Sequence, residues 1–166
     1  MAIDHVLKLY AETIRSPYLH YGFWDEPEKV NADSLSIDDI AEAQGRYIEH
    51  LTSFIPDDVR SILDVGCGVG GNAAYLQERG FDIDVLSPDP YQEEVIKKIF
   101  NGALEFFKSK FENFKADRTY DLILESESAC YIKIEQGFTS ARRALRVGGY
   151  LLAADYFVYF RDDRGS

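Results

Sequence analysis

The residues with the most evident chemical use form a glycine-rich turn after a short apolar run. Residues 62–65 are mostly branched and apolar, and Gly66, Gly68 and Gly70 follow at alternate positions. The run is typical of a buried central strand, and glycine lets a ligand approach the backbone closely. A helix that begins after the turn would point its N–H groups into the same space. The pattern predicts a pocket for a polar or anionic group, and the simpler alternative is a tight strand–helix turn.

The residue sequence of this turn distinguishes between two kinds of cofactor site. A dinucleotide site has the pattern G-x-G-x-x-G, and Gly71 would fill its last place. Residues 64–70 read D-V-G-C-G-V-G, which resembles motif I of class I S-adenosylmethionine (SAM)-dependent methyltransferases. In that family the glycine backbone faces the methionine part of SAM, and the acid orders the turn and helps to hold the amino end. The resemblance therefore assigns cofactor binding to Asp64, Gly66, Cys67, Gly68 and Gly70.

An aromatic segment lies well ahead of the turn, at residues 18–25. Its sequence H-Y-G-F-W-D is similar to the segment before the first core helix in tocopherol, sterol and glycine-type N-methyltransferases, where aromatic side chains cover SAM and the acceptor. Aromatic faces suit a sulfonium because they attract cations. Tyr21 and Trp24 are the predicted cofactor contacts, Tyr21 is also a catalytic candidate, and His20 is a candidate base. The alternative is an N-terminal arm that only packs onto the domain.

Polar residues after the second and third predicted strands are candidates for the nucleoside part of SAM. Residues 85–88, which read V-L-S-P, resemble the T-L-S-P turn of cyclopropane-fatty-acid synthase and tocopherol methyltransferase relatives, which lacks the usual ribose-binding acid. Ser87, Asp89 and Gln92 are therefore the predicted ribose contacts, with a helix-start turn as the alternative. Phe111 and Glu112 fall where the family contacts adenine. They match the family pattern incompletely, so a solvated loop is equally expected.

The loop after the fourth predicted strand reads E-S-E-S-A-C-Y over residues 125–131. It resembles the I-E-x-x-C-H segment of sterol and related methyltransferases, with Glu127 at the acidic position and Tyr131 in place of the histidine. A polar run directly after a buried strand is costly unless it faces a site. Glu127 is predicted to contact SAM or the acceptor, and Tyr131 to orient the acceptor. Both are catalytic candidates.

Alternating strands and helices must position these residues. The alternation predicts an α/β, Rossmann-like, doubly wound parallel sheet of strand order 3-2-1-4-5. In such a sheet, the loops after the strands line one crevice. The predicted strands are 61–65, 81–86, 103–107, 120–125 and 150–158, and the predicted helices are 2–15, 37–54, 70–79, 91–100 and 133–146.

The chain divides into an N-terminal helix with an aromatic lid segment, at 1–36, and a SAM-binding core at 37–166. Family members usually continue after strand five with an antiparallel sixth and seventh strand, which are absent here. The chain is then a fragment, a naturally short protein, or one that another chain completes. Strand five would be an apolar edge, which favours pairing with a second copy. A homodimer through this edge is therefore expected.

Composition narrows the classes of partner. The 18 basic and 29 acidic residues give a net charge of −11, which argues against nucleic acid or an anionic membrane surface as a general partner. The sequence has no apolar run of membrane-spanning length, no signal-peptide pattern and no metal-ligand spacing. Its two cysteines suggest no disulfide framework. A cytoplasmic location is the default expectation.

The predicted function is SAM-dependent transfer of a methyl group to O, N or C of a small-molecule acceptor. The first alternative is a non-catalytic or incomplete domain that binds SAM or S-adenosylhomocysteine. The second is a nucleotide- or NAD-binding domain, which only the glycines support. No residue pattern in the sequence identifies the acceptor.

Overall fold

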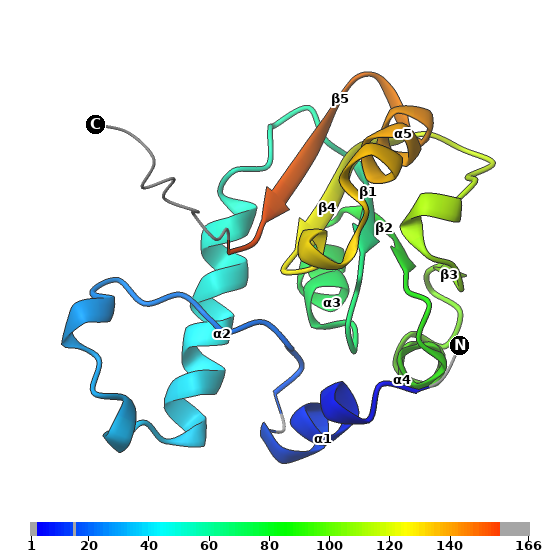
Figure 1. The fold of residues 1–166 in the computed structure, drawn as a ribbon. Coiled ribbons are helices and arrows are strands. Elements are labelled where there is room, and N and C mark those ends of the chain that lie inside the picture. The colour runs from blue at the N-terminus through cyan, green and yellow to red at the C-terminus, as the bar shows by residue number, and fades with distance from the viewer. Residues whose placement is uncertain (1–2, 15, 157–166) are drawn as a thin grey trace, which may run out of the picture.

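Five parallel strands form the central sheet of the protein, in the order β3-β2-β1-β4-β5 (Figure 1). The computed structural model describes residues 3–14 and 16–156. The predicted strand order and the parallel direction are both confirmed. The strands are β1 Ser61–Val65, β2 Asp82–Leu86, β3 Phe106–Phe107, β4 Tyr120–Ser126 and β5 Leu145–Ala154.

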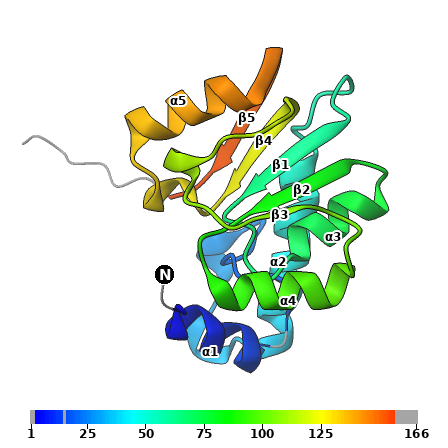
Figure 2. The ribbon, with the colours of Figure 1, turned by 90° about the vertical axis from the view of Figure 1, so that its right-hand side faces the viewer.

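Helices cover both faces of this sheet (Figure 2). Helices α2, α3 and α4 pack on one face, and α5 packs on the other together with the short helix η3. The helices are α1 His5–Ile14, α2 Ile37–Thr52, α3 Gly71–Glu78, α4 Pro90–Phe100 and α5 Ile134–Ala144, and the 3₁₀ turns are η1 Pro27–Lys29, η2 Ala32–Ser34, η3 Phe111–Asn113 and η4 Ala129–Tyr131.

The central strand β1 is buried on both sides, as its apolar sequence predicts. Ile62 packs against the α2–α4 side and Leu63 against the α5 side, and both are fully buried. Each such side chain stabilises the fold by about 1.5–3 kcal/mol. The strand therefore holds the glycine turn that follows it in a fixed place.

Helix α2 begins where the sequence predicts it. The Ser36 hydroxyl accepts a hydrogen bond from the Asp39 backbone N–H, and the Asp39 carboxylate accepts one from the Ser36 backbone N–H. This reciprocal capping box satisfies two N–H groups that the helix cannot satisfy itself. It fixes the start of the helix on which the aromatic segment rests.

The boundary between α5 and β5 differs from the prediction. We expected a helix to residue 146 and a Gly148-Gly149 turn before a strand at 150–158. Instead α5 ends at Ala144, β5 begins at once, and both glycines lie inside the strand, where its pairing with β4 changes register. The predicted strand also extends too far, because it ends at Ala154. Residues 157 and 158 lie outside the described residues.

The remaining differences concern one strand and one helix. The predicted third strand at 103–107 is only two residues long, at Phe106–Phe107. Helix α1 lies beyond the carboxyl ends of the strands, beside α4 (Figures 1 and 2), and buries none of its residues.

Among the described residues, no helix has the length and apolar character needed to cross a membrane.

Candidate functional site

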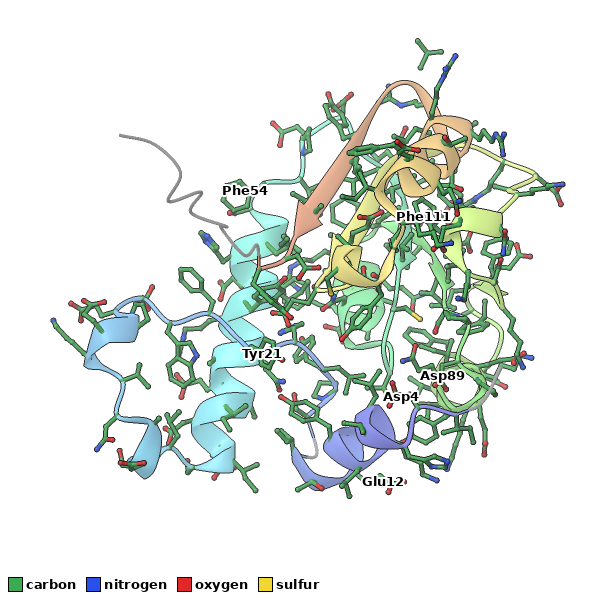
Figure 3. All side chains as sticks on the ribbon, in the orientation of Figure 1. Asp4, Glu12, Tyr21, Phe54, Asp89 and Phe111 are labelled. Atoms are coloured by element: carbon green, nitrogen blue, oxygen red, sulfur yellow. The ribbon has the colours of Figure 1, made fainter. Side chains whose placement is uncertain are left out.

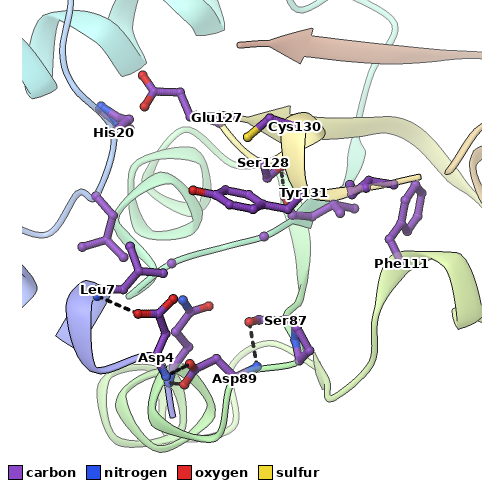
Figure 4. A pocket seen from close by; sticks show the side chains of 18 of the residues that line it. Asp4, Leu7, His20, Ser87, Asp89, Phe111, Glu127, Ser128, Cys130 and Tyr131 are labelled. Carbon is purple, nitrogen blue, oxygen red and sulfur yellow. Dashed lines mark hydrogen bonds between the residues drawn. The ribbon is translucent and has the colours of Figure 1, made fainter. Parts of the chain in front are cut away.

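A cavity of about 670 Å³ opens beyond the carboxyl ends of β1, β2 and β4, next to α1 (Figure 4). This volume is within the usual range for small-molecule sites, and the place is where an open α/β sheet binds ligands. Most of the predicted site residues line the cavity, namely His20, Tyr21, Gly66, Gly68, Ser87, Asp89, Gln92, Phe111, Glu112, Glu127 and Tyr131. The four predicted residues that do not line it are Trp24, Asp64, Cys67 and Gly70.

The glycine turn forms one wall of the cavity with its backbone. Gly66 has a φ of 77°, and its N–H donates to the Leu86 carbonyl at 2.8 Å. A Cβ atom on Gly66 would lie 2.5 Å from the Ser128 Cβ. Any larger residue would therefore push the β4 loop away from the turn, besides being strained at this φ. The Ser128 hydroxyl completes this contact by donating to the Val65 carbonyl at 2.6 Å.

Gly70 and Cys67 have packing roles rather than places in this cavity. Gly70 is the residue before α3, and a Cβ atom there would collide with Ile96 and Phe100 of α4. Cys67 is buried and lines a separate space of about 30 Å³ between the turn and the aromatic segment. Burial raises the pKa of its thiol well above the usual value, and the Asp64 charge adds to the effect, so the thiol stays protonated.

Asp64 is enclosed within the sheet instead of facing the cavity. Its side chain is 1% exposed, and neither carboxylate oxygen has a hydrogen-bond partner in the described part of the chain. Burial alone raises the pKa of Asp64 to about 7, because a buried carboxylate without partners disfavours its charged form. The predicted role of Asp64 at the amino end of SAM stays a prediction, and the structure places this side chain behind the cavity wall.

The residues after β2 line the cavity and also build the start of α4. The Asp89 carboxylate accepts from the backbone N–H groups of Tyr91 and Gln92, at 2.7 and 3.3 Å, and from that of Asp4 at 2.8 Å. Figure 3 shows Asp4 of the N-terminal segment next to Asp89. Asp89 therefore both caps the start of α4, as the alternative predicted, and lines the cavity. Gln92 is 6% exposed, and its Oε1 atom has no partner.

The loop after β3 contributes a hydrophobic wall. Phe111 is 2% exposed and packs with Phe114 beneath the cavity. The Glu112 carboxylate accepts from the Lys133 backbone N–H at 3.3 Å, so it ties this loop to the start of α5. The loop is thus ordered by packing and is not simply solvated.

His20 lies at the opposite side of the cavity from Asp89 (Figure 4). Its ring packs against those of Tyr18 and Tyr47, with ring centroids 5.0 and 4.1 Å away and ring planes tilted by 32° and 31°. It is 5% exposed, and neither ring nitrogen has a hydrogen-bond partner among residues 3–14 and 16–156. Burial lowers the pKa of His20 to about 4, so the imidazole is neutral at pH 7 and is a weak base.

Tyr21 and Glu127 join the aromatic segment to the β4 loop. The Tyr21 backbone N–H donates to both oxygens of Glu127, each at 3.2 Å. Glu127 has a φ of 51°, and its own N–H donates to the Ala154 carbonyl at 2.7 Å. Burial, with a contribution from Asp155, raises the pKa of Glu127. The resulting carboxyl group is a better proton acceptor than an ordinary glutamate.

Trp24 lies outside the cavity, contrary to its predicted place over the cofactor. Its indole ring covers the Arg46 guanidinium of α2 at 5.6 Å. The chain turns onto α2 before this residue, since the Phe23 backbone N–H donates to the Ala43 carbonyl at 2.8 Å. Only the first part of the aromatic segment therefore reaches the cavity, and its second part packs on α2.

Sequence reasoning missed several cavity residues. Asp155 follows β5, and its carboxylate accepts from the Cys130 backbone N–H at 2.9 Å. Tyr10 of α1 also lines the cavity and accepts a hydrogen bond from the Gln44 amide at 3.2 Å. The predicted strand at 150–158 contained Asp155, so its place after the end of a parallel strand is seen only in the structure, where β5 ends at Ala154. In the sequence, Tyr10 is one of several apolar residues at helical spacing, so nothing marked it as a site residue.

The fold and the glycine turn define a class I, Rossmann-like methyltransferase architecture. A methyltransferase-domain family model matches residues 63–153, more than half of the chain. The chain belongs to this family. It is 30% identical to methyltransferase GfsG of Streptomyces halstedii over 84% of the chain and 51% of the relative. It is 28% identical to the fatty-acid O-methyltransferase of Mycolicibacterium smegmatis over 83% of the chain and 52% of the relative.

Solved structures share the same fold. The geranyl diphosphate C-methyltransferase of Streptomyces coelicolor, which was solved with S-adenosylhomocysteine, superimposes with a TM-score of 0.69 at 18% identity. The match covers 85% of this chain and 58% of that protein. The chain therefore spans about half the length of the relatives that it matches.

Among residues 3–14 and 16–156, no group of three His, Cys, Asp or Glu side chains is placed to hold a metal ion.

Proposed function

We propose that this chain binds SAM in the cavity and transfers its methyl group to a small-molecule acceptor. The observation that carries the proposal is the cavity itself, which has the backbone of Gly66 and Gly68 on one wall and carboxylates around it. The sulfonium and ammonium groups of SAM are cationic, so an acidic, partly aromatic cavity suits them. Gln92 and His20 also offer buried polar atoms that have no partner among the described residues.

Each wall of the cavity has a role in this proposal. When bound, SAM supplies an electrophilic methyl group, whose carbon–sulfur bond breaks with the electron pair left on sulfur as the acceptor forms its new bond. The glycine turn receives the methionine part, and Asp89, Gln92 and Phe111 receive the nucleoside. Tyr21 and Tyr131 lie at the side where an acceptor enters, since both are largely exposed. Alignment and exclusion of water are the main contributions of the protein.

If the small molecule that receives the methyl group must lose a proton, Glu127 is the best-placed residue to take it. Its pKa is raised, whereas that of His20 is lowered to about 4. A base works best when its pKa is close to the operating pH. Glu127 therefore takes the base role, and His20 acts as a neutral hydrogen-bonding group.

Calorimetric titration of the chain with S-adenosylhomocysteine, SAM and NAD tests the proposal. We expect both adenosyl ligands to bind and NAD not to bind. In Gly66→Ala we expect binding to be lost, because the new methyl group would meet Ser128. Gly80→Ala is the matched control, since Gly80 also has a positive φ but open space around its Cβ position. Binding that survives Gly66→Ala, or that Gly80→Ala also removes, would contradict the assignment.

Methyl transfer from labelled SAM, measured across O-, N- and C-acceptors, separates the enzyme from a second candidate. That candidate is a non-catalytic module that binds SAM or S-adenosylhomocysteine in the same cavity. Binding without turnover on any acceptor would support the module. The net charge of −11 favours a small molecule over nucleic acid as the acceptor.

A further inference from the structure

We infer that the acceptor is a small molecule with a basic amine, which binds in its protonated form. This inference rests on the proposed function. It concerns the half of the cavity that comes from α1, the aromatic segment and the ends of β4 and β5, which we call the acceptor half. Its defining residues are Tyr10, His20, Tyr21, Glu127, Tyr131 and Asp155.

Two carboxylates in the acceptor half have no cationic partner within residues 3–14 and 16–156. In the described part of the chain, no Lys, Arg or His nitrogen lies within 4.0 Å of Glu127 or Asp155. Their partners are backbone N–H groups, those of Tyr21 for Glu127 and of Cys130 for Asp155. These donors satisfy hydrogen bonds but bring no positive charge. No side chain that the structure describes therefore neutralises Glu127 or Asp155 by an ion pair.

The walls around these carboxylates also suit a cation. Tyr10, Tyr21 and Tyr131 line this half, and the negative face of a phenol ring attracts an ammonium group. Tyr21 and Tyr131 are 70% and 81% exposed, so their rings are available at the mouth. The one lysine that lines the cavity, Lys110, precedes Phe111 in the nucleoside half.

His20 is the independent sign of a ligand in this half. Its ring is 5% exposed and lines the cavity, and neither nitrogen has a hydrogen-bond partner in the part of the chain that the structure describes. Figure 4 shows the Glu127 carboxylate directed toward the side on which His20 lies. A neutral imidazole nitrogen accepts a hydrogen bond, and an ammonium group donates up to three. A protonated amine could thus donate hydrogen bonds to both the His20 imidazole and the Glu127 carboxylate.

The chemistry of transfer is consistent with this acceptor. A protonated amine has no lone pair to attack with, so one N–H proton must first leave, and the Glu127 carboxylate receives it. The nitrogen lone pair then forms the bond to the methyl carbon while the carbon–sulfur bond breaks, with its electron pair left on sulfur. A carboxylate or phosphate acceptor would instead bring further negative charge beside two carboxylates, which disfavours its binding.

Three ligands that differ mainly in charge test this inference on the unmodified chain: phenethylamine, 2-phenylethanol and phenylacetate. Each is titrated at pH 7.5 by calorimetry, with and without saturating S-adenosylhomocysteine. We expect phenethylamine to bind at least about tenfold more tightly than 2-phenylethanol, because opposite charges attract in a partly buried site. Phenylacetate should bind most weakly. Phenylacetate binding as tightly as the amine, or binding of none of the three, would overturn the inference.

Variants that remove the two negative charges test whether Glu127 and Asp155 cause the preference for the amine. In the double variant Glu127→Gln with Asp155→Asn, the preference for phenethylamine over 2-phenylethanol should fall to near parity. The control Glu49→Gln removes an exposed carboxylate from α2, outside the cavity, and should leave the preference unchanged. The ligand series on the unmodified chain decides the question even if the double variant does not fold. Binding of S-adenosylhomocysteine without an amine preference refutes only this inference, whereas failure of that ligand to bind refutes the proposed function.

Discussion

Asp64 is a carboxylic acid without hydrogen-bond partners in the interior of a parallel sheet. An unfolded aspartate has a pKa of about 4, and burial raises that of Asp64 to about 7. Between these values, the unfolded chain has lost the proton and the folded chain keeps it. The free energy of unfolding therefore falls as the pH rises through this window.

The variant Asp64→Asn cannot ionise and should lose this dependence. Relative to the wild type, we expect its free energy of unfolding to rise by about 3 kcal/mol between about pH 5 and pH 8. Urea denaturation at the two pH values measures the difference. The change at Asp64 isolates one group, because the other titrating groups are common to both proteins. A difference that is the same at both pH values would show that Asp64 ionises freely in the folded state.

Site residues could be read from the sequence where a local motif fixes the backbone. Gly66 and Glu127 line the cavity as predicted because each directly follows a buried strand. Trp24 could not be placed in this way, because its position depends on Arg46 of another element. Asp64 belongs to the motif, but its enclosure depends on the helices that cover that face of the sheet.

At the scale of elements, Asp89 connects two helices. One carboxylate oxygen caps α4, and the other accepts from the Asp4 backbone N–H just before α1. Asparagine caps a helix about as well as aspartate, but its side chain has only one oxygen. Asp89→Asn therefore keeps the cap and breaks the anchor of α1, whereas Asp89→Ala breaks both.

We expect Asp89→Ala to lower the free energy of unfolding by about 1 kcal/mol and Asp89→Asn to change it by only a few tenths. Hydrogen exchange in α1 should become faster in both variants, because α1 buries none of its own residues. Chemical denaturation and amide exchange measure the two effects. Equal stability of the two variants would argue against the capping role, and unchanged exchange in α1 would argue against the anchor.

The order of strands and helices was predictable, but the boundary between α5 and β5 was not. Three arginines near residue 146 read as the basic end of a helix. In the structure, Arg146 lies in β5 and forms ion pairs with Asp121 and Asp58. These partners are distant in sequence, so no local pattern indicates them. Gly148, with a φ of 76°, accommodates the change of register inside the strand.

At the scale of the whole molecule, β5 is the edge of the described sheet, where it pairs with β4. Val147 is fully exposed and Tyr150 is 38% exposed on this strand. An exposed apolar edge is a template for another strand. The expected homodimer through this edge stays a proposal, and light scattering at rising protein concentration tests it.

A lysine in place of Val147 should shift the chain toward the monomer, because a charged edge residue opposes strand pairing. Leu9→Lys is the matched control, since Leu9 is 66% exposed on α1 and lies away from the sheet edge. We expect it to leave self-association unchanged. A wild-type chain that stays monomeric at high concentration would contradict the proposal.

The hydrogen bond from Tyr21 to Glu127 joins residues that are 106 positions apart, and this separation sets the order in which the protein is assembled during synthesis. At about 5–20 residues per second, the aromatic segment waits roughly 5 to 20 seconds for its partner to leave the ribosome. During that interval β1 also lacks β4 on one side. A nascent chain therefore presents the glycine turn before the opposite wall exists, and it becomes competent to hold a ligand only after β4 and its loop have been made.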